Sequence, residues 1–172
     1  RSSRYWNPGA GITVTLLILG LPPAARAQMV ISTDLTVSDS FIVTDPLVVV
    51  NGDDPILKLT DDRHLNWSGA LVIGAAPGAS GNVVVEQMSD LTLWGGGGVM
   101  DLFPDTDIPI LDGVVYLGLQ SGSAGTLTVS SSATVDSRIM QVGYLGNGDV
   151  TVESGGYVSL QDLVIGSKAG SV

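Results

Sequence analysis

The chain has 172 residues, of which 23 are glycine, 5% are aromatic and none is cysteine. Its content of valine, leucine, threonine and serine favours strands and turns over helices. The net charge of −10 makes nucleic acid and anionic lipid unfavourable partners, and the absence of cysteine excludes a disulfide framework.

The first 27 residues are typical of an export signal. Arg1 and Arg4 form a basic head, residues 9–21 form an apolar stretch, and 25–27 place small residues at positions −3 and −1 before Gln28. The apolar stretch would extend about 20 Å as a helix, short of the roughly 30 Å of a bilayer core. A secretory signal peptide over 1–27 is therefore favoured over a transmembrane anchor, and we expect an exported protein with no transmembrane segment in this fragment.

Residues 28–70 alternate between apolar and polar side chains, but without a regular period. The short apolar stretches are 35–37, 41–43, 47–50, 56–59 and 65–67. Alternation over so few residues indicates strands. We interpret this segment as an N-terminal cap followed by degenerate coils, because the first unit of a repeat array needs a covering layer.

From residue 71 to 172 the sequence repeats. Residues 129–143 align without a gap with residues 152–166, which lie 23 positions later. Four glycines hold the same place in successive units, at intervals of 44, 25 and 23 residues: Gly74, Gly118, Gly143 and Gly166. The first interval contains an insertion of about 19 residues, at about 94–113. The last unit stops before it is complete, so we expect the array to be truncated at its C-terminus.

Each unit contains three short strands of period 2 and no helical stripe. Stacked units would pair each strand with its counterpart, which predicts a right-handed parallel β-helix (solenoid) with coils of about 23 residues. The four glycines are then structural, at corners with positive φ, and the inward side chains are Val83, Val85, Leu127, Val129, Val150 and Val152. An antiparallel sandwich or barrel is the competing interpretation, and the near-constant period favours the solenoid. Bare strand edges on the last coil predict aggregation of the chain expressed alone.

Three sequence steps carry a resemblance to a known family. Residues 140–143 (MQVG), 146–152 (GNGDVTV) and 154–158 (SGGYV) follow one another, and 66–74 forms a tryptophan-containing lead-in. Over about 65–172 the chain resembles the repeats of autotransporter (type V secretion) passengers and of some PEP-CTERM-associated exported proteins. The resemblance implies a β-helix passenger at the surface of a Gram-negative-type bacterium or released from it, with a possible downstream outer-membrane barrel as its anchor. The insertion at 94–113 departs from the family pattern.

The single histidine is the first candidate for chemistry. His64 follows Asp61, Asp62 and Arg63, a composition compatible with a catalytic dyad or half of a metal site. The sequence offers no second histidine, no cysteine and no G-x-S-x-G nucleophile to complete either site. A solvated polar turn is the favoured interpretation.

The acidic insertion is the second candidate. Its carboxylates could bind calcium or hydrolyse a glycosidic bond, and they are Asp101, Asp105, Asp107 and Asp112. They match neither an EF-hand nor a glycine-rich calcium repeat, so an exposed loop is favoured. Gly95 to Gly98 lack the lysine of a phosphate loop and indicate a flexible linker. Trp67 and Trp94 could stack on sugar, plug the end of a coil or cover a loop.

The sequence thus predicts no catalytic, cofactor-binding or metal-binding residues. The leading functional hypothesis is a non-catalytic structural scaffold or adhesin-like passenger, exported to the cell surface, the outer membrane or the medium. Its partners would be glycans or proteins on host or neighbouring cells. The alternative is a β-helix carbohydrate-active enzyme that uses the acidic insertion, and a calcium-dependent module is a third hypothesis.

Overall fold

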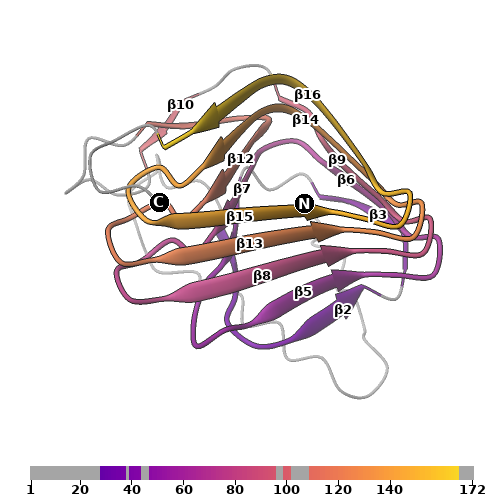
Figure 1. Ribbon diagram of the computed structural model, residues 1–172, viewed down its shortest axis with the longest axis horizontal. Coiled ribbons are helices and arrows are strands. Elements are labelled where there is room, and N and C mark those ends of the chain that lie inside the picture. Colours follow the sequence, from indigo (N-terminus) through magenta and orange to yellow (C-terminus); the bar gives the residue numbers. More distant parts are fainter. Residues whose placement is uncertain (1–27, 38, 44–46, 96–98, 102–108, 167–172) are drawn as a thin grey trace, which may run out of the picture.

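The computed structural model describes residues 28–37, 39–43, 47–95, 99–101 and 109–166, and this part of the chain contains only strands, turns and loops. The predicted signal peptide, 1–27, lies outside the described residues, and its cleavage stays a prediction. Most strands belong to two sheets (Figure 1).

The strands of the larger sheet are β1 (Gln28–Ile31), β3 (Phe41–Val43), β4 (Leu47–Val50), β6 (His64–Trp67), β7 (Ala70–Ile73), β9 (Asp90–Leu93), β12 (Val114–Leu117), β14 (Thr134–Val142) and β16 (Tyr157–Ile165). The smaller sheet contains β2 (Leu35–Val37), β5 (Ile56–Leu59), β8 (Ser80–Val85), β13 (Ala124–Val129) and β15 (Asn147–Val152). In addition, β10 (Val99–Asp101) pairs antiparallel with β11 (Pro109–Leu111).

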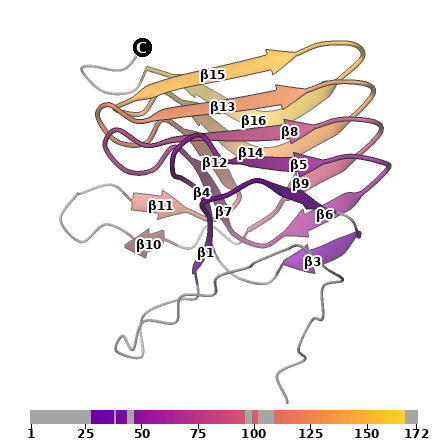
Figure 2. The ribbon, with the colours of Figure 1, turned by 90° about the horizontal axis from the view of Figure 1, so that it is seen from below.

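Strand pairing in the two main sheets is parallel and joins equivalent positions of successive units. In the smaller sheet Val129 pairs with Val85 on one side and with Val152 on the other. In the larger sheet Met140 pairs with Leu163, as the 23-residue repeat predicts. In Figure 2 the labelled strands of the smaller sheet, β5, β8, β13 and β15, follow one another in this order, from purple to yellow. The alignment of the repeats therefore describes the strand register correctly.

The predicted right-handed parallel β-helix with 23-residue coils is nevertheless wrong. The strands form two parallel sheets, one of nine strands curled into a half-barrel and one of five, in the orders β1-β4-β7-β12-β14-β9-β6-β3 (with β16 beside β14) and β15-β13-β8-β5-β2. Strand length explains the difference, because β14 is nine residues long and pairs with both β9 and β12. Two rows of short strands thereby merge into one sheet, and three equal strands per unit do not form.

Unit length is also uneven, since paired residues are 19 positions apart for Gln28 and Leu47 but 44 apart for Leu71 and Val115. Residues 28–70, which the sequence separates as a cap, contribute six strands to the same two sheets, each in parallel register with a later strand.

The main core lies between the two sheets. Alternation buries Val83, Val85, Leu127 and Val129, as the period-2 pattern predicts. Val150 is only partly buried, and Val152 is 48% exposed although it is the in-register partner of the buried Val129. Both residues belong to β15, which has a described neighbour on one side only.

A second apolar cluster covers the other face of the larger sheet. It unites side chains from β4, β7 and β12 with the end of the insertion: Val49, Ala70, Val72, Ala75, Ile110, Val114, Tyr116 and Leu119. Ile110, on β11, is fully buried there. The interpretation of 94–113 as an exposed loop therefore needs correction at its C-terminal end, because an apolar strand end can cover sheet surface that water would otherwise contact.

The register places the insertion closely. Thr92 and Val114 are 22 positions apart, whereas their partners Asp136 and Ile139 are 3 apart, so the unit has 19 extra residues, in agreement with the repeat spacing. The insertion closes at its base, because Gly95 lies so near Asp112 that a Cβ would come within 2.4 Å of the Asp112 Cβ. Gly95 is thus a packed position and not part of a free linker, while 96–98 lie outside the described residues.

The repeat glycines lie at tight corners with positive φ: 69° at Gly74, 64° at Gly118, 66° at Gly143 and 62° at Gly166. A Cβ on Gly118 would lie 2.1 Å from the carbonyl oxygen of Asn147 in the next unit. The glycine backbone N–H donates to the Ile73 carbonyl, 2.9 Å away in the preceding unit. Successive units therefore approach each other here through backbone alone.

Tyr116 ties the insertion to the sheet, and its titration gives a first prediction. The Leu111 N–H donates to the Tyr116 hydroxyl at 3.0 Å, and burial raises the pKa of Tyr116 above its usual 10.0. The unfolded chain therefore loses this proton first, so the contribution of Tyr116 to stability is complete below pH 10 and is lost as pH rises through the higher folded-state pKa.

We expect Tyr116→Phe to lower the free energy of unfolding by about 1–3 kcal/mol at pH 7, because a partly buried N–H loses its acceptor. Urea unfolding at pH 7 and at pH 11 checks this. The gap between the native protein and the variant should narrow at the higher pH, and a gap independent of pH would contradict the assignment.

Candidate functional site

An open groove with a volume of about 340 Å³ lies on the described surface, beside the start of the insertion. It crosses the stacked strands β9, β14 and β16, and the polar and aromatic side chains along it are Thr92, Trp94, Asp136, Arg138, Ser159 and Gln161. Leu93, Ser137 and Leu160 add to its floor. The volume falls at the lower end of the range of small-molecule sites, about 300–1,000 Å³.

Strand register builds the polar wall of this groove. Asp136 pairs with Thr92 on one neighbouring strand and with Ser159 on the other. Adjacent strands are about 4.8 Å apart, so the three side chains form a straight row of hydroxyl, carboxylate and hydroxyl groups. All three residues line the groove, and none of their side chains forms a hydrogen bond with another described residue.

The two tryptophans singled out in the sequence have different environments. Trp67 is 1% exposed and packs in the core between the sheets, whereas Trp94 is 57% exposed and lines the groove. The Trp94 backbone N–H donates to the Trp67 carbonyl at 2.8 Å, which fixes where the exposed ring leaves the sheet. Of the two tryptophan candidates, Trp94 is thus the one that lies in the groove.

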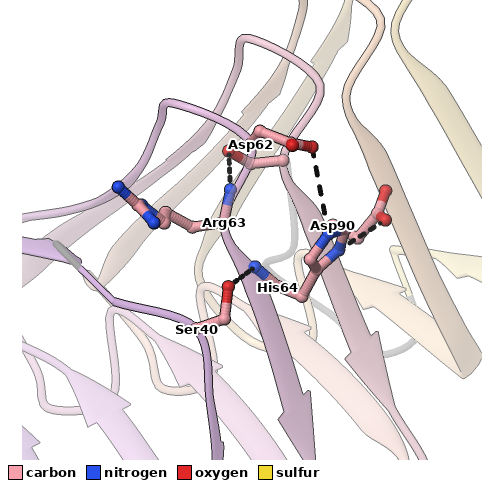
Figure 3. A network of polar contacts seen from close by, with 6 residues as sticks. Ser40, Asp62, Arg63, His64 and Asp90 are labelled. Carbon is pink, nitrogen blue, oxygen red and sulfur yellow. Dashed lines mark hydrogen bonds and ion pairs between the residues drawn. The ribbon is translucent and has the colours of Figure 1, made fainter.

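His64 lies elsewhere, at the start of β6, between two carboxylates (Figure 3). Its ring Nδ1 is 2.9 Å from Asp90 Oδ2, and its Nε2 is 3.8 Å from Asp62 Oδ1. Ser40 accepts a hydrogen bond from the backbone N–H of His64, at 2.9 Å, and not from the ring. The residues of a Ser-His-Asp triad are therefore present, but the ring nitrogen that would activate the serine faces a carboxylate instead.

Lys58 and Glu86 form an ion pair of 2.7 Å between β5 and the turn after β8. The hydrogen bond from Lys58 lowers the pKa of Glu86. Both side chains are partly exposed, and such surface pairs contribute at most about 1 kcal/mol. The pair joins two neighbouring strands and offers no evident chemistry.

The acidic candidates do not converge on one place within the described structure. Asp105 and Asp107 lie outside the described residues, Asp101 belongs to β10, and Asp112 is half-buried at the base of the insertion. In the part of the chain that the structure describes, no group of three or more potential ligands could hold a metal ion. The same described residues include no helix that is long and apolar enough to cross a bilayer.

Sequence reasoning missed the polar side chains that lie along the groove with Trp94, which are Thr92, Asp136, Arg138, Ser159 and Gln161. The signal was present in the repeat, because aligning 129–143 with 152–166 puts Asp136 level with Ser159. What the alignment could not show was the bend between the Ser137–Leu160 and Ile139–Asp162 pairs, beside which Arg138 and Gln161 line the same groove.

The chain was compared with protein-family models, with curated proteins and with solved structures, and none of the three comparisons gave a match. The functional argument therefore depends on this chain's own geometry.

Proposed function

We propose that this chain belongs to an exported, non-catalytic structural scaffold of adhesin-like character, which holds a recognition surface in a fixed place. The observation that carries the proposal is the parallel, in-register pairing of successive units, from Gln28 in β1 to Ile165 in β16. Each unit is bonded directly to the next, so a load or a bound partner at one point is shared by the backbone hydrogen bonds of both sheets.

Two sequence features support export. Residues 1–27 have the order of a basic head, an apolar stretch and small residues that precedes a secretory cleavage site. Their apolar stretch is shorter than a bilayer-spanning helix needs. Cell-surface or extracellular localisation follows as a proposal, and the resemblance of the repeats to autotransporter passengers supports the same location.

A carbohydrate-active enzyme is the second candidate, because the groove opens beside the first residues of the acidic insertion. Glycoside hydrolysis commonly uses two carboxylates that flank the scissile bond. Among the described residues that line the groove, Asp136 is the one carboxylate. The groove as described is better suited to binding a saccharide than to hydrolysing it, and the released reducing ends from soluble polysaccharides would measure any cleavage.

The export proposal is tested by expressing the full chain with a C-terminal tag in a Gram-negative bacterium. We expect the mature protein outside the cytoplasm, with an N-terminus at Gln28 by mass spectrometry. An Ala27→Asp variant, which puts a charge at the −1 position, should remain uncleaved. Uncleaved native protein confined to the cytoplasm would overturn the proposal.

A further inference from the structure

We propose that the groove beside Trp94 binds a neutral saccharide chain, with the tryptophan ring as a stacking platform and the row Thr92–Asp136–Ser159 as the hydrogen-bonding wall. This inference rests on the proposed scaffold function and names the class of partner that the scaffold would hold.

The exposed ring of Trp94 offers a surface for stacking. Trp94 is the aromatic residue among the described residues that line the groove, and it is exposed although its backbone N–H is bonded to Trp67 in the preceding unit. Gly95 follows and packs tightly against Asp112, so the chain on both sides of the indole is held in place. A large apolar ring that is exposed to water gains most from a partner with an apolar face and a polar rim. A sugar ring has this construction, because its C–H groups share one face while its hydroxyls surround the edge.

The polar wall of the groove offers groups for hydrogen bonding. Thr92 and Ser159 supply hydroxyls that can donate and accept, Asp136 accepts, and Arg138 and Gln161 lie beside the bend. Together they provide donors and acceptors in mixture, which suits the hydroxyls of a sugar better than the acceptors of a phosphate. Thr92, Asp136 and Ser159 lie on adjacent strands about 4.8 Å apart, so they can contact successive parts of one extended ligand.

The charge of the groove and of the whole protein favours a neutral ligand. The groove carries one described carboxylate, Asp136, and one described guanidinium, Arg138, and neither forms an ion pair with a described residue. The protein as a whole has a net charge of −10, which repels anionic ligands. A neutral glycan satisfies both charged groups by hydrogen bonds and meets no long-range repulsion. Acidic polysaccharides should bind less well than neutral ones.

The experiment is a titration of the full chain with neutral oligosaccharides, with cellohexaose, xylohexaose and mannohexaose as separate probes. Binding is followed by calorimetry and by NMR of the indole N–H groups. We expect at least one probe to bind with a dissociation constant below about 10 mM, and Trp94→Ala to weaken that binding by about tenfold or more. Trp94→Phe, which keeps an aromatic face, should weaken it less than Trp94→Ala does.

Tyr157 provides a matched control, because this aromatic side chain is also exposed but does not line the groove. Tyr157→Ala should leave saccharide binding unchanged, and unaltered melting curves would show that the variants are folded. The proposal is overturned if no neutral probe binds, if Trp94→Ala binds as tightly as the native chain, or if a charged glycan or a peptide binds in place of the neutral sugars.

The result is separable from the test of export, because cleavage at Ala27 and localisation do not depend on Trp94. Correct export without saccharide binding would remove this inference alone. Saccharide binding by a chain that remains in the cytoplasm would remove the export proposal alone.

Discussion

Gly118→Ala is expected to destabilise the protein by about 4 kcal/mol or more, or to prevent folding. The new methyl group would lie 2.1 Å from the Asn147 carbonyl oxygen, and the backbone of the next unit cannot move away without losing its pairing. The Gly118 carbonyl also accepts from the Gly146 N–H, at 3.0 Å. Losses of this size are exceptional for a single methyl group, and urea unfolding measures them.

Gly122→Ala is the matched control, because it measures the cost of a positive φ without a steric clash. Gly122 has a φ of 77° and the nearest atom to its Cβ would be 3.7 Å away. Gly122→Ala should therefore cost only the strain of positive φ, about 1–2 kcal/mol. If the two alanine variants unfold at the same urea concentration, the close approach between units at Gly118 is not the reason for the glycine.

Ile110→Ala carries the second large effect, with an expected loss of about 2–5 kcal/mol in the free energy of unfolding. Its side chain is fully buried in the cluster on the outer face of the larger sheet, so truncation leaves a cavity in addition to the lost burial. An exposed loop, which is what the sequence suggests for this segment, would show almost no effect.

The matched control is Ile165→Ala on β16, where the side chain is 71% exposed. This change should alter stability by no more than about 0.5 kcal/mol. Equal effects of the two isoleucine variants in thermal or urea unfolding would show that the insertion does not cover the sheet.

The repeat in the sequence carried most of the strand register. Residues 129–143 and 152–166 pair as aligned, and the four repeat glycines all have positive φ. The sequence predicts these features because alternation sets which side chains face inward and the repeat sets which positions of successive units are neighbours.

The way the strands share sheets could not be read from the same pattern. The repeat predicts three short strands per unit, but nothing in the sequence of 134–142 marks whether a strand ends at Arg138 or continues through it. In β14 it continues, and its register with both β9 and β12 joins two rows into one curled sheet. Sheet curvature of this kind depends on contacts between units and not on local propensity.

Some turns also lacked a sequence signal. Gln87 and Met88 both have positive φ, at 53° and 60°, although neither is a glycine or asparagine. Their backbone is held by the neighbouring units, since the Gln87 carbonyl accepts from the Asp62 N–H at 3.0 Å and the Met88 N–H donates to the Ser131 carbonyl at 3.0 Å. Stacking imposes this conformation, so the residue types alone do not predict it.

At the candidate site, too, some features follow from the sequence and others only from the stacking of the units. Trp94 could be identified as a sugar-stacking candidate from its residue type, but its exposure and the burial of Trp67 depend on which face of the sheet each occupies. The partners Asp136 and Ser159 became visible only when the units were stacked in register.

The most direct test of the stacked, parallel register is a pair of engineered cysteines in a chain that has none of its own. Thr128 and Thr151 are partners on β13 and β15, about 4.8 Å apart, within the Cα separation that a disulfide spans. Thr126 and Thr151 are offset by two residues, which places them about 8 Å apart and beyond that span. Under mild oxidation the double variant Thr128→Cys/Thr151→Cys should form an intramolecular disulfide, and Thr126→Cys/Thr151→Cys should not. Equal yields, or a preference for the offset pair, would contradict the parallel pairing of successive units.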